Sequence, residues 1–228
     1  MTRSVVWALT LLAAVGFVAI AWAVSAGLTA GTDRDLMLSL RSAADPEDPL
    51  GPLWLEAALA EVTALGGYTI LVILSAIVLG SLLLLGEGRA AAFLFASLVS
   101  GSLVSSGLKL LFARPRPDLV GHLDQTFTSS FPSAHAMVST VAYMTLAAVA
   151  VRFLPMRRER VYVVVVAALL AFAIGASRVY LGVHWPSDVL AGWLAGGAWA
   201  GLCWLAADAW TRSFALPGRI GRTYAVRP

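Results

Sequence analysis

The sequence predicts an all-α membrane protein: a polytopic bundle of six transmembrane helices with a possible interfacial helix in its first outer loop. Of the 228 residues, 59% are hydrophobic and only 29 are charged (16 basic and 13 acidic), and the mean hydropathy is +0.82. A soluble chain carries about a quarter charged residues, roughly twice as many. The small polar surface excludes a cytosolic enzyme, a disordered tail and a secreted disulfide scaffold.

Six stretches without a charged residue are long enough to cross a bilayer. They cover residues 4–32, 62–86, 90–108, 125–151, 161–177 and 189–207. A helix that crosses the hydrocarbon core needs about 20 apolar residues, and it satisfies its own backbone hydrogen bonds. The fourth span is expected from Ser133 to Leu154, because Gln125 to Ser130 are polar. The first is expected to be retained, because it is far longer than the ~7–15 apolar residues of a signal peptide.

The basic residues predict the orientation. With the N-terminus inside, ten of the 16 basic residues lie on the inner side: Arg3, Arg89, Arg152, Arg157, Arg158, Arg160, Arg212, Arg219, Arg222 and Arg227. Lys and Arg are enriched on the cytoplasmic side of membrane proteins. We therefore expect a multi-pass protein of the cell membrane with both termini inside and the segments 109–131 and 178–188 outside. The basic residues form no patch with interleaved aromatics, so no nucleic-acid partner is expected.

The first outer loop, residues 31–66, is the longest. Residues 54–64 are amphipathic, which predicts either a helix lying at the membrane interface or a loop helix packed on the bundle. In the sixth span, Gly192-x3-Gly196 and Gly197-x3-Gly201 are patterns that let helices approach closely, and packing inside the bundle is favoured over dimerisation. A monomer or homodimer is expected, with residues 1–228 forming one domain and Cys203 buried as an apolar residue.

The first chemical cluster follows the third span. Because Arg114 and Arg116 each precede a proline, both should be extended, and the helix should end near Ala113. Lys109, one turn inside the helix, can then extend outward. The extended segment that follows carries Arg116 back across the same outer end of the span. Two such cations suit a phosphate, although they could equally be interfacial anchors.

The second cluster, Phe131-Pro132-Ser133-Ala134-His135, opens the fourth span. Ser133 is well placed as the N-cap, which leaves backbone N–H groups of the first turn available to an anion. His135 can reach the same anion. The alternative is an ordinary helix cap with a nearby histidine.

The third cluster joins the last two spans, with Arg178 at the end of one and Asp188 at the start of the next. Pro186 and Ser187 suit a helix start, and an acidic residue in the first turn stabilises the helix dipole. Asp188 can instead accept a hydrogen bond from Nδ1–H of His184, which leaves Nε2 free to attack. Each cluster has a structural alternative, but all three map to one membrane side, where ionisable groups are functional candidates.

Together the clusters resemble the three signature motifs of the type 2 phosphatidic acid phosphatase family: Lys-x6-Arg-Pro, Pro-Ser-Gly-His and Ser-Arg-x5-His-x3-Asp. They stand here as Lys109-x6-Arg116-Pro117, Pro132-Ser133-Ala134-His135 and Ser177-Arg178-x5-His184-x3-Asp188. The resemblance spans residues 109–188, and the six-span layout is like that of the family's membrane members. It implies hydrolysis of a lipid phosphate or pyrophosphate at the outer face, through a phosphohistidine.

The resemblance also implies roles for the site residues. His184 would be the nucleophile, Asp188 would orient it, and His135 would protonate the leaving oxygen. The phosphoryl group would be bound by Lys109, Arg116, Ser133, Ala134 and Arg178. Ala134 stands where the family usually has Gly; its backbone N–H is retained, while its methyl group narrows the pocket.

Two further expectations concern cofactors and alternatives. Asp188 is the only carboxylate in the motifs, too few for Mg²⁺ or Zn²⁺, so no metal and no cofactor are expected. Arg114 lies outside the motif, and its replacement by Lys is expected to leave activity near wild type. The open alternatives are a phosphotransferase acting on a lipid or sugar acceptor and a non-catalytic lipid transporter. Polyprenyl pyrophosphate, phosphatidylglycerol phosphate, phosphatidic acid and lipid A all fit as substrates.

Overall fold

The computed structural model describes residues 2–124 and 128–213. These residues form eight helices: α1 (Arg3–Ser25), α2 (Ala30–Leu38), α3 (Leu53–Ala64), α4 (Tyr68–Leu84), α5 (Gly88–Phe112), α6 (Ala134–Ala150), α7 (Arg157–Tyr180) and α8 (Pro186–Ser213). The predicted all-α class is confirmed. The predicted inner position of Arg219, Arg222 and Arg227, and the polar stretch from Gln125, concern residues outside the described ranges.

The number of membrane spans is only partly settled by helix length. In the described part of the chain, α1, α5, α7 and α8 are long and apolar enough to cross a membrane, and α3 with α4 adds a fifth candidate if the pair, bent by 48°, is one span. α6 is apolar but has only 17 residues. The protein is therefore a polytopic α-helical membrane protein with four to five candidate spans, and the predicted count of six is not confirmed.

One predicted boundary is wrong, and the first charge-free stretch contains parts of two helices. α6 ends at Ala150 instead of Leu154, because Leu154 precedes Pro155, and a residue before proline is disfavoured in the helical conformation. α1 ends at Ser25. A separate helix, α2, begins at Ala30, near the end of the first charge-free stretch, and continues into the first outer loop. Gly27, with a φ of 73°, supplies the left-handed residue that ends α1.

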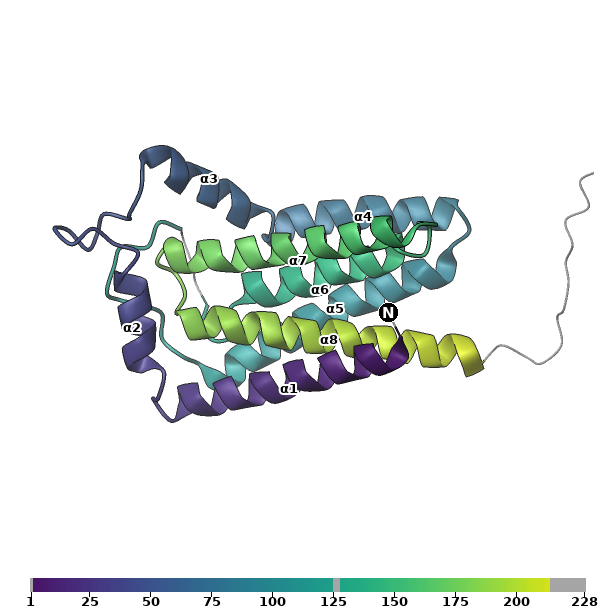
Figure 1. Cartoon of the computed structure of the whole chain (residues 1–228), viewed down its shortest axis with the longest axis horizontal. Coiled ribbons are helices and arrows are strands. Elements are labelled where there is room, and N and C mark those ends of the chain that lie inside the picture. Colours follow the sequence, from purple (N-terminus) through teal and green to yellow (C-terminus); the bar gives the residue numbers. More distant parts are fainter. Residues whose placement is uncertain (1, 125–127, 214–228) are drawn as a thin grey trace, which may run out of the picture.

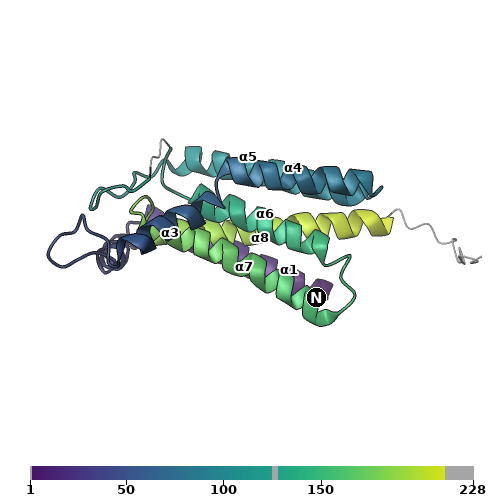
Figure 2. The same cartoon turned by 90° about the horizontal axis from the view of Figure 1, so that it is seen from above.

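α6 lies at the centre of the bundle and packs against α5, α7 and α8. α1 packs on α8, and α4 packs on α5. Figure 1 shows these six helices running along the long axis of the molecule, and Figure 2 shows α4 and α5 together on one side of it. The helix with the most buried side chains therefore carries the second chemical cluster at its N-terminus.

The glycines of α8 set two helix–helix contacts. A Cβ atom on Gly196 would lie 2.6 Å from the carbonyl oxygen of Met137 in α6, and one on Gly192 would lie 2.8 Å from the carbonyl oxygen of Ser133. A Cβ atom on Gly201 would collide with Thr10 of α1. The expectation that these glycines pack inside the bundle is confirmed, because they allow α8 to lie between α6 and α1.

α1 begins and α8 ends at the same end of the bundle (Figure 1), where Arg3 Nε lies 3.7 Å from Asp208 Oδ2. α2 and α3 lie at the opposite end. α3 packs against α7 through Leu55 and Leu59, while Trp54 is 69% exposed. Residues 54–64 therefore form a helix that packs on the bundle, as one of the two interpretations expected, except that Trp54 is not on the packed face.

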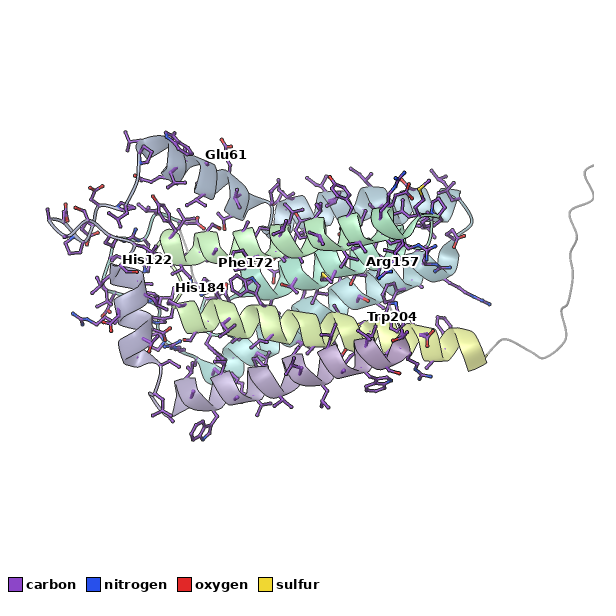
Figure 3. All side chains as sticks on the ribbon, viewed as in Figure 1. Glu61, His122, Arg157, Phe172, His184 and Trp204 are labelled. Atoms are coloured by element: carbon purple, nitrogen blue, oxygen red, sulfur yellow. The ribbon has the colours of Figure 1, made fainter. Side chains whose placement is uncertain are left out.

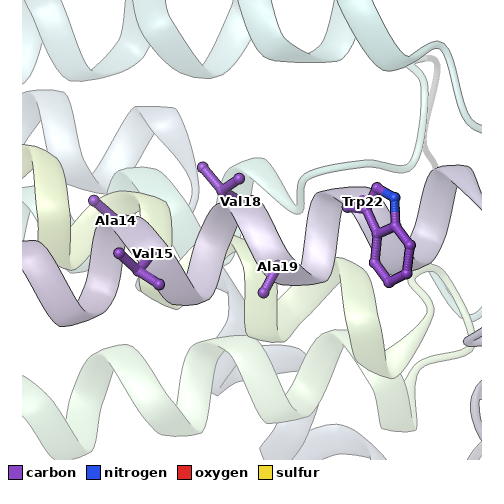
Figure 4. A pocket seen from close by; sticks show the side chains of 5 residues that line it. All are labelled: Ala14, Val15, Val18, Ala19 and Trp22. Carbon is purple, nitrogen blue, oxygen red and sulfur yellow. The ribbon is translucent and has the colours of Figure 1, made fainter.

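A surface depression on α1 is apolar and is lined by Ala14, Val15, Val18, Ala19 and Trp22 (Figure 4). None of these side chains can donate a proton or attack a phosphorus atom. Val18 and Trp22 are about two-thirds exposed, at 64% and 66%, as expected of a surface in contact with lipid chains. The chemistry of the protein lies elsewhere.

Candidate active site

The three sequence clusters meet at the end of the bundle where α2 and α3 lie. Figure 3 shows His184 and His122 at this end, and Arg157 and Trp204 toward the other. The cluster residues come from the C-terminal ends of α5 and α7, the N-terminal ends of α6 and α8, and the two connecting segments. Six of the eight predicted site residues come from four helix ends that the bundle packing brings together.

The segment after α5 folds back across the end of that helix. α5 ends at Phe112, and Ala113 takes a left-handed φ of 43°, which turns the chain. Ser129 Oγ donates to the carbonyl oxygen of Lys109 (2.8 Å), and Lys109 Nζ donates to the carbonyl oxygen of Ser129. Lys109 is buried, at 8% exposure. The prediction that the helix ends near Ala113 with Lys109 at its mouth is confirmed.

Arg116 is fixed by three different oxygen atoms. Its Nε donates to the carbonyl oxygen of Thr128 (2.8 Å), its Nη2 to Thr128 Oγ1 (3.3 Å), and its Nη1 to the carbonyl oxygen of Val183 (2.6 Å). Burial, followed by the neighbouring charge of Arg178, lowers the pKa of Arg116 to about 10. The guanidinium therefore remains a cation at neutral pH and is held rigidly.

His184 lies between α7 and α8 and is 1% exposed. Its Nε2 lies 3.3 Å from Nη1 of Arg116. Because a guanidinium only donates hydrogen bonds, Nε2 is the acceptor and the proton of the neutral ring is on Nδ1. Burial lowers the pKa of His184 to about 3, although the hydrogen bond with Asp188 opposes this shift. The ring is neutral at pH 7, with the Nε2 lone pair toward Arg116.

Asp188, in the first turn of α8, is completely buried behind His184. Its Oδ2 lies 3.5 Å from His184 Nδ1 and accepts hydrogen bonds from the hydroxyl of Ser130 and from the backbone N–H of Trp185 (3.0 Å). Ser130 Oγ also lies 3.3 Å from His184 Nδ1. The predicted contact of Asp188 with His184 is present, and the Ser130 hydroxyl bridges the two side chains.

The N-terminus of α6 opens into the same site. Ser133 is its N-cap and accepts a hydrogen bond from the N–H of Ala136 (3.5 Å), as predicted. The N–H of Ser133 donates to the carbonyl oxygen of Asp188 (3.0 Å). The N–H groups of Ala134 and His135 precede the first helical hydrogen bond and are positioned for an anion. The charges of Arg178, Lys109 and Arg116 all act on His135.

Arg178 is 1% exposed near the end of α7. Its Nη1 donates to Thr63 Oγ1 (3.1 Å) and lies 2.5 Å from Oδ2 of Asp124, whose side chain is 40% exposed. The structure thus places a carboxylate on the third predicted phosphate-binding cation. A phosphate that uses the same nitrogen must replace Asp124.

Four residues of this site were not predicted from the sequence: Asp33, Arg114, Asp124 and Ser130. Arg114 lies outside the motif, as expected, but its Nη1 donates to Asp188 Oδ1 (2.6 Å) and so brings it into the site. The sequence held a signal for Arg114, the first arginine of Arg-Pro-Arg-Pro. Asp33 lies 155 positions before Asp188, and no local pattern connects them.

Across residues 2–124 and 128–213, no three His, Cys, Asp or Glu side chains gather as metal ligands would. Around His184 the single carboxylate of Asp188 is joined by two cations, Arg116 and Lys109. The chemistry that these residues can support is the binding of an anion next to a neutral imidazole.

The sequence also matches known proteins. A family model described as the PAP2 superfamily matches residues 90–212, more than half of the chain. Phosphatidylglycerophosphatase B of Bacillus subtilis is 30% identical over 144 residues, which cover 63% of this chain and 70% of that protein. Undecaprenyl-diphosphatase of Sulfolobus acidocaldarius is 37% identical over 67 residues, 29% of this chain and 28% of that protein.

The fold is shared with a solved structure. The crystal structure of a transmembrane PAP2-type phosphatidylglycerolphosphate phosphatase from Bacillus subtilis matches with a TM-score of 0.79 at 23% identity, covering 92% of this chain and 98% of that chain. Sequence family and fold therefore agree, and the three motifs lie within the matched segment. The chain belongs to the PAP2 superfamily and is a membrane lipid phosphatase of that family.

Proposed function

We propose that the protein hydrolyses a lipid phosphate or pyrophosphate at the outer membrane face through a phosphohistidine on His184. The observation that carries this proposal is the placement of His184: its Nε2 lies 3.3 Å from Arg116, while Nδ1 is backed by Ser130 and Asp188. A neutral imidazole with its lone pair beside a fixed guanidinium is arranged to attack a phosphoryl group that the guanidinium holds.

In the first step, His184 Nε2 attacks phosphorus and the bond from phosphorus to the lipid oxygen breaks. The negative charge of the bound phosphate offsets the neighbouring cations, so His135 is protonated in the substrate complex. It gives this proton to the leaving oxygen, and the product is the lipid alcohol or lipid monophosphate. The Nδ1 proton of His184 stays in place, held toward Ser130 and Asp188, and the imidazolium charge is balanced by Asp188. The lipid product carries the proton that His135 gave up.

In the second step, water attacks the phosphohistidine. His135, now neutral, takes one proton from the water while the phosphorus–nitrogen bond breaks and inorganic phosphate leaves. His184 regains its Nε2 lone pair, and His135 regains its proton. The two steps together consume one water molecule and return both histidines to their starting states.

The phosphoryl oxygens are bound by Lys109, Arg116 and Arg178. Phosphoryl transfer spreads negative charge over the equatorial oxygens, and fixed cations stabilise it. The hydroxyl of Ser133 and the backbone N–H of Ala134 add donors at the N-terminus of α6. The methyl group of Ala134 reduces the room beside the phosphate but leaves the backbone contact available.

The membrane topology we propose has six spans, both termini inside and the site outside. α4 and α6 have 17 residues each, about 25 Å at ~1.5 Å per residue, near the lower limit for a span. α1 begins and α8 ends at one end of the bundle, which supports an even number of crossings. Labelling of single cysteines introduced at Ser39 and Arg157, in a chain with Cys203 replaced, tests the orientation from each side of intact vesicles.

The activity is tested with a panel of phosphatidylglycerol phosphate, polyprenyl diphosphate, phosphatidic acid and lipid A, measuring phosphate release by purified protein. His184→Ala is expected to abolish release, and His122→Ala, a second histidine at this end of the bundle, serves as the matched control. His135→Ala is expected to become phosphorylated by a substrate with a very good leaving group, because such a group needs no general acid. More than a few per cent of activity in His184→Ala would exclude the nucleophile assignment.

The same preparation separates hydrolysis from transfer. Phosphate from a labelled lipid is followed into water and into lipid or sugar acceptors. Release into water at the same rate with and without acceptor supports a hydrolase. Label that appears on the acceptor instead would make the protein a phosphotransferase, and phosphate binding without a trapped phosphohistidine would make it a non-catalytic lipid-binding protein.

A further inference from the structure

α2 brings a buried carboxylate, that of Asp33, close to the pair formed by His184 and Asp188. Asp33 is 2% exposed. Its Oδ1 accepts a hydrogen bond from the N–H of Ser187 (2.8 Å), and its Oδ2 accepts from Ser187 Oγ (2.6 Å) and from Nη2 of Arg114 (2.9 Å). Each contact joins residues far apart in the chain.

Arg114 stands between two carboxylates. Nη2 bonds to Asp33, while Nη1 bonds to Asp188 Oδ1 (2.6 Å) and Ser187 Oγ (2.8 Å). The guanidinium carbon also lies 5.6 Å from the ring centre of Trp185, a cation–π contact. The Arg114 side chain is only 16% exposed, so this group is held by several groups at once.

We propose that Asp33 and Arg114 are positioning residues of the phosphatase reaction, acting through Asp188 on His184, and that α2 thereby completes the active site. This inference rests on the proposed function of His184. Neither residue is assigned to bind the phosphate: Arg114 faces Asp33, Ser187 and Asp188, whereas Arg116 faces His184.

The two oxygens of Asp188 have separate partners. Oδ1 is bonded to Arg114, and Oδ2 faces Ser130, the N–H of Trp185 and His184 Nδ1. With Oδ1 held, the carboxylate cannot rotate, and Oδ2 keeps the imidazole in the tautomer and orientation that attack requires. Loss of the Arg114 contact would free that rotation.

Asp33 has a second effect on the same carboxylate. Because Arg114 bonds to both Asp33 and Asp188, its positive charge is shared between two carboxylates. Asp188 therefore keeps part of its negative charge. Asp33 also holds the N–H of Ser187 in the first turn of α8, the turn that carries Asp188. Asp33 lies outside residues 90–212, the segment matched by the family model, so its part in the site is visible only in the folded chain.

The test compares kcat and KM for phosphate release by full-length Asp33→Asn and Arg114→Gln. We expect kcat to fall about 10-fold and about 100-fold respectively, the range for a misplaced catalytic group, while KM stays within about two-fold because the phosphate contacts remain. Asp35→Asn, an exposed acid in the same helix, is the matched control and is expected to match wild type.

Two further measurements separate positioning from mere stability. The double variant Asp33→Asn/Arg114→Gln is expected to lose no more than Arg114→Gln alone, because both residues act through one ion pair. If either variant fails to fold, Asp33→Glu or Arg114→Lys replaces it, each with an expected kcat below that of wild type. Losses that add fully, or that follow the folded fraction, overturn the inference.

His184→Ala in the same series separates the two proposals. This inference alone would be overturned if His184→Ala were inactive while Asp33→Asn and Arg114→Gln had the same kcat as Asp35→Asn. An active His184→Ala would overturn the proposed function. A rise in KM with unchanged kcat in the Arg114 variants would make Arg114 a phosphate ligand, which also contradicts a positioning role.

Discussion

Nη1 of Arg116 lies 3.3 Å from Nε2 of His184, and the same nitrogen donates to the carbonyl oxygen of Val183 at 2.6 Å. The guanidinium is therefore tied to the chain segment that carries the nucleophile. Its planar group also bonds to Thr128 through Nε. The proposed phosphate site beside Arg116 and His184 is therefore held in position by hydrogen bonds within the protein before the substrate binds.

Arg116→Lys is expected to lower kcat/KM by one to two decades. An ammonium group cannot reproduce the planar fork, and charge-assisted hydrogen bonds contribute about 1.5–3 kcal/mol each. Steady-state phosphate release measures the effect. Arg157→Lys, exposed at the other end of the bundle (Figure 3), is the control and is expected to match wild type. An equal loss in both variants would contradict a phosphate clamp at Arg116.

Asp124→Asn is expected to lower KM several-fold. The Asp124 carboxylate lies 2.5 Å from Nη1 of Arg178, and an incoming phosphate must replace this anion at the same nitrogen. A neutral amide competes less well for the cation than a carboxylate does. The measurement is KM for a lipid phosphate, with the exposed Asp118→Asn as control. A higher KM in Asp124→Asn would show that this carboxylate assists substrate binding.

Acidification is expected to destabilise the protein through His184. In an unfolded chain this side chain has a pKa of about 6.5, whereas burial lowers the pKa in the folded protein to about 3. Between pH 6.5 and pH 3, His184 is therefore protonated in the unfolded state but not in the folded state. The stability that the neutral side chain provides above pH 6.5 is lost as the pH falls toward 3. From pH 7.5 to pH 5 this loss is about 2 kcal/mol in the free energy of unfolding.

The comparison for this prediction is His184→Gln, which lacks the titrating group. Unfolding in detergent at both pH values is expected to show a larger decrease in stability for wild type than for the variant. An equal decrease in both proteins would mean that His184 is protonated in the folded state at pH 5.

Gly196→Ala is expected to destabilise the bundle by more than about 1 kcal/mol, because the new Cβ atom would lie 2.6 Å from the carbonyl oxygen of Met137 and 2.8 Å from Thr140 Cβ. Gly80→Ala in α4 is the matched control: a Cβ atom there has no heavy atom within 4 Å, and alanine is favoured in a helix by about 0.5–1 kcal/mol. Melting temperatures in detergent test the pair. Similar shifts at both positions would contradict the close contact of α8 with α6.

Activity is expected to survive EDTA and to be inhibited competitively by vanadate. The cations Lys109, Arg116 and Arg178 would supply the charge stabilisation that metal ions give in two-metal phosphatases. A trigonal-bipyramidal vanadate with His184 as axial ligand resembles the transition state of phosphoryl transfer. Phosphate release with each reagent is the measurement. Activity that is lost in EDTA and returns with Mg²⁺ would contradict the histidine mechanism.

The sequence alone predicted the features that depend on neighbours in the chain. Charge-free stretches predicted the long helices, and the prolines predicted where they stop and start: α5 ends at Phe112 before Arg114-Pro115, and α8 begins at Pro186. Ser133 was predicted as the N-cap of α6. Such features follow from local backbone sterics, capping and the need to exclude charge from hydrocarbon, all of which can be read from the chain.

Only the tertiary structure decided which side chains complete the site. Asp33 reaches Ser187 across 154 positions, and Ser130 reaches Asp188 across 58. These contacts exist because α8 lies between α6 and α1, and because α2, which follows α1, lies at the end of the bundle that holds the site. Hydrogen bonds of this kind depend on atoms within about 3 Å, and no spacing in the sequence fixes such distances before the helices have packed.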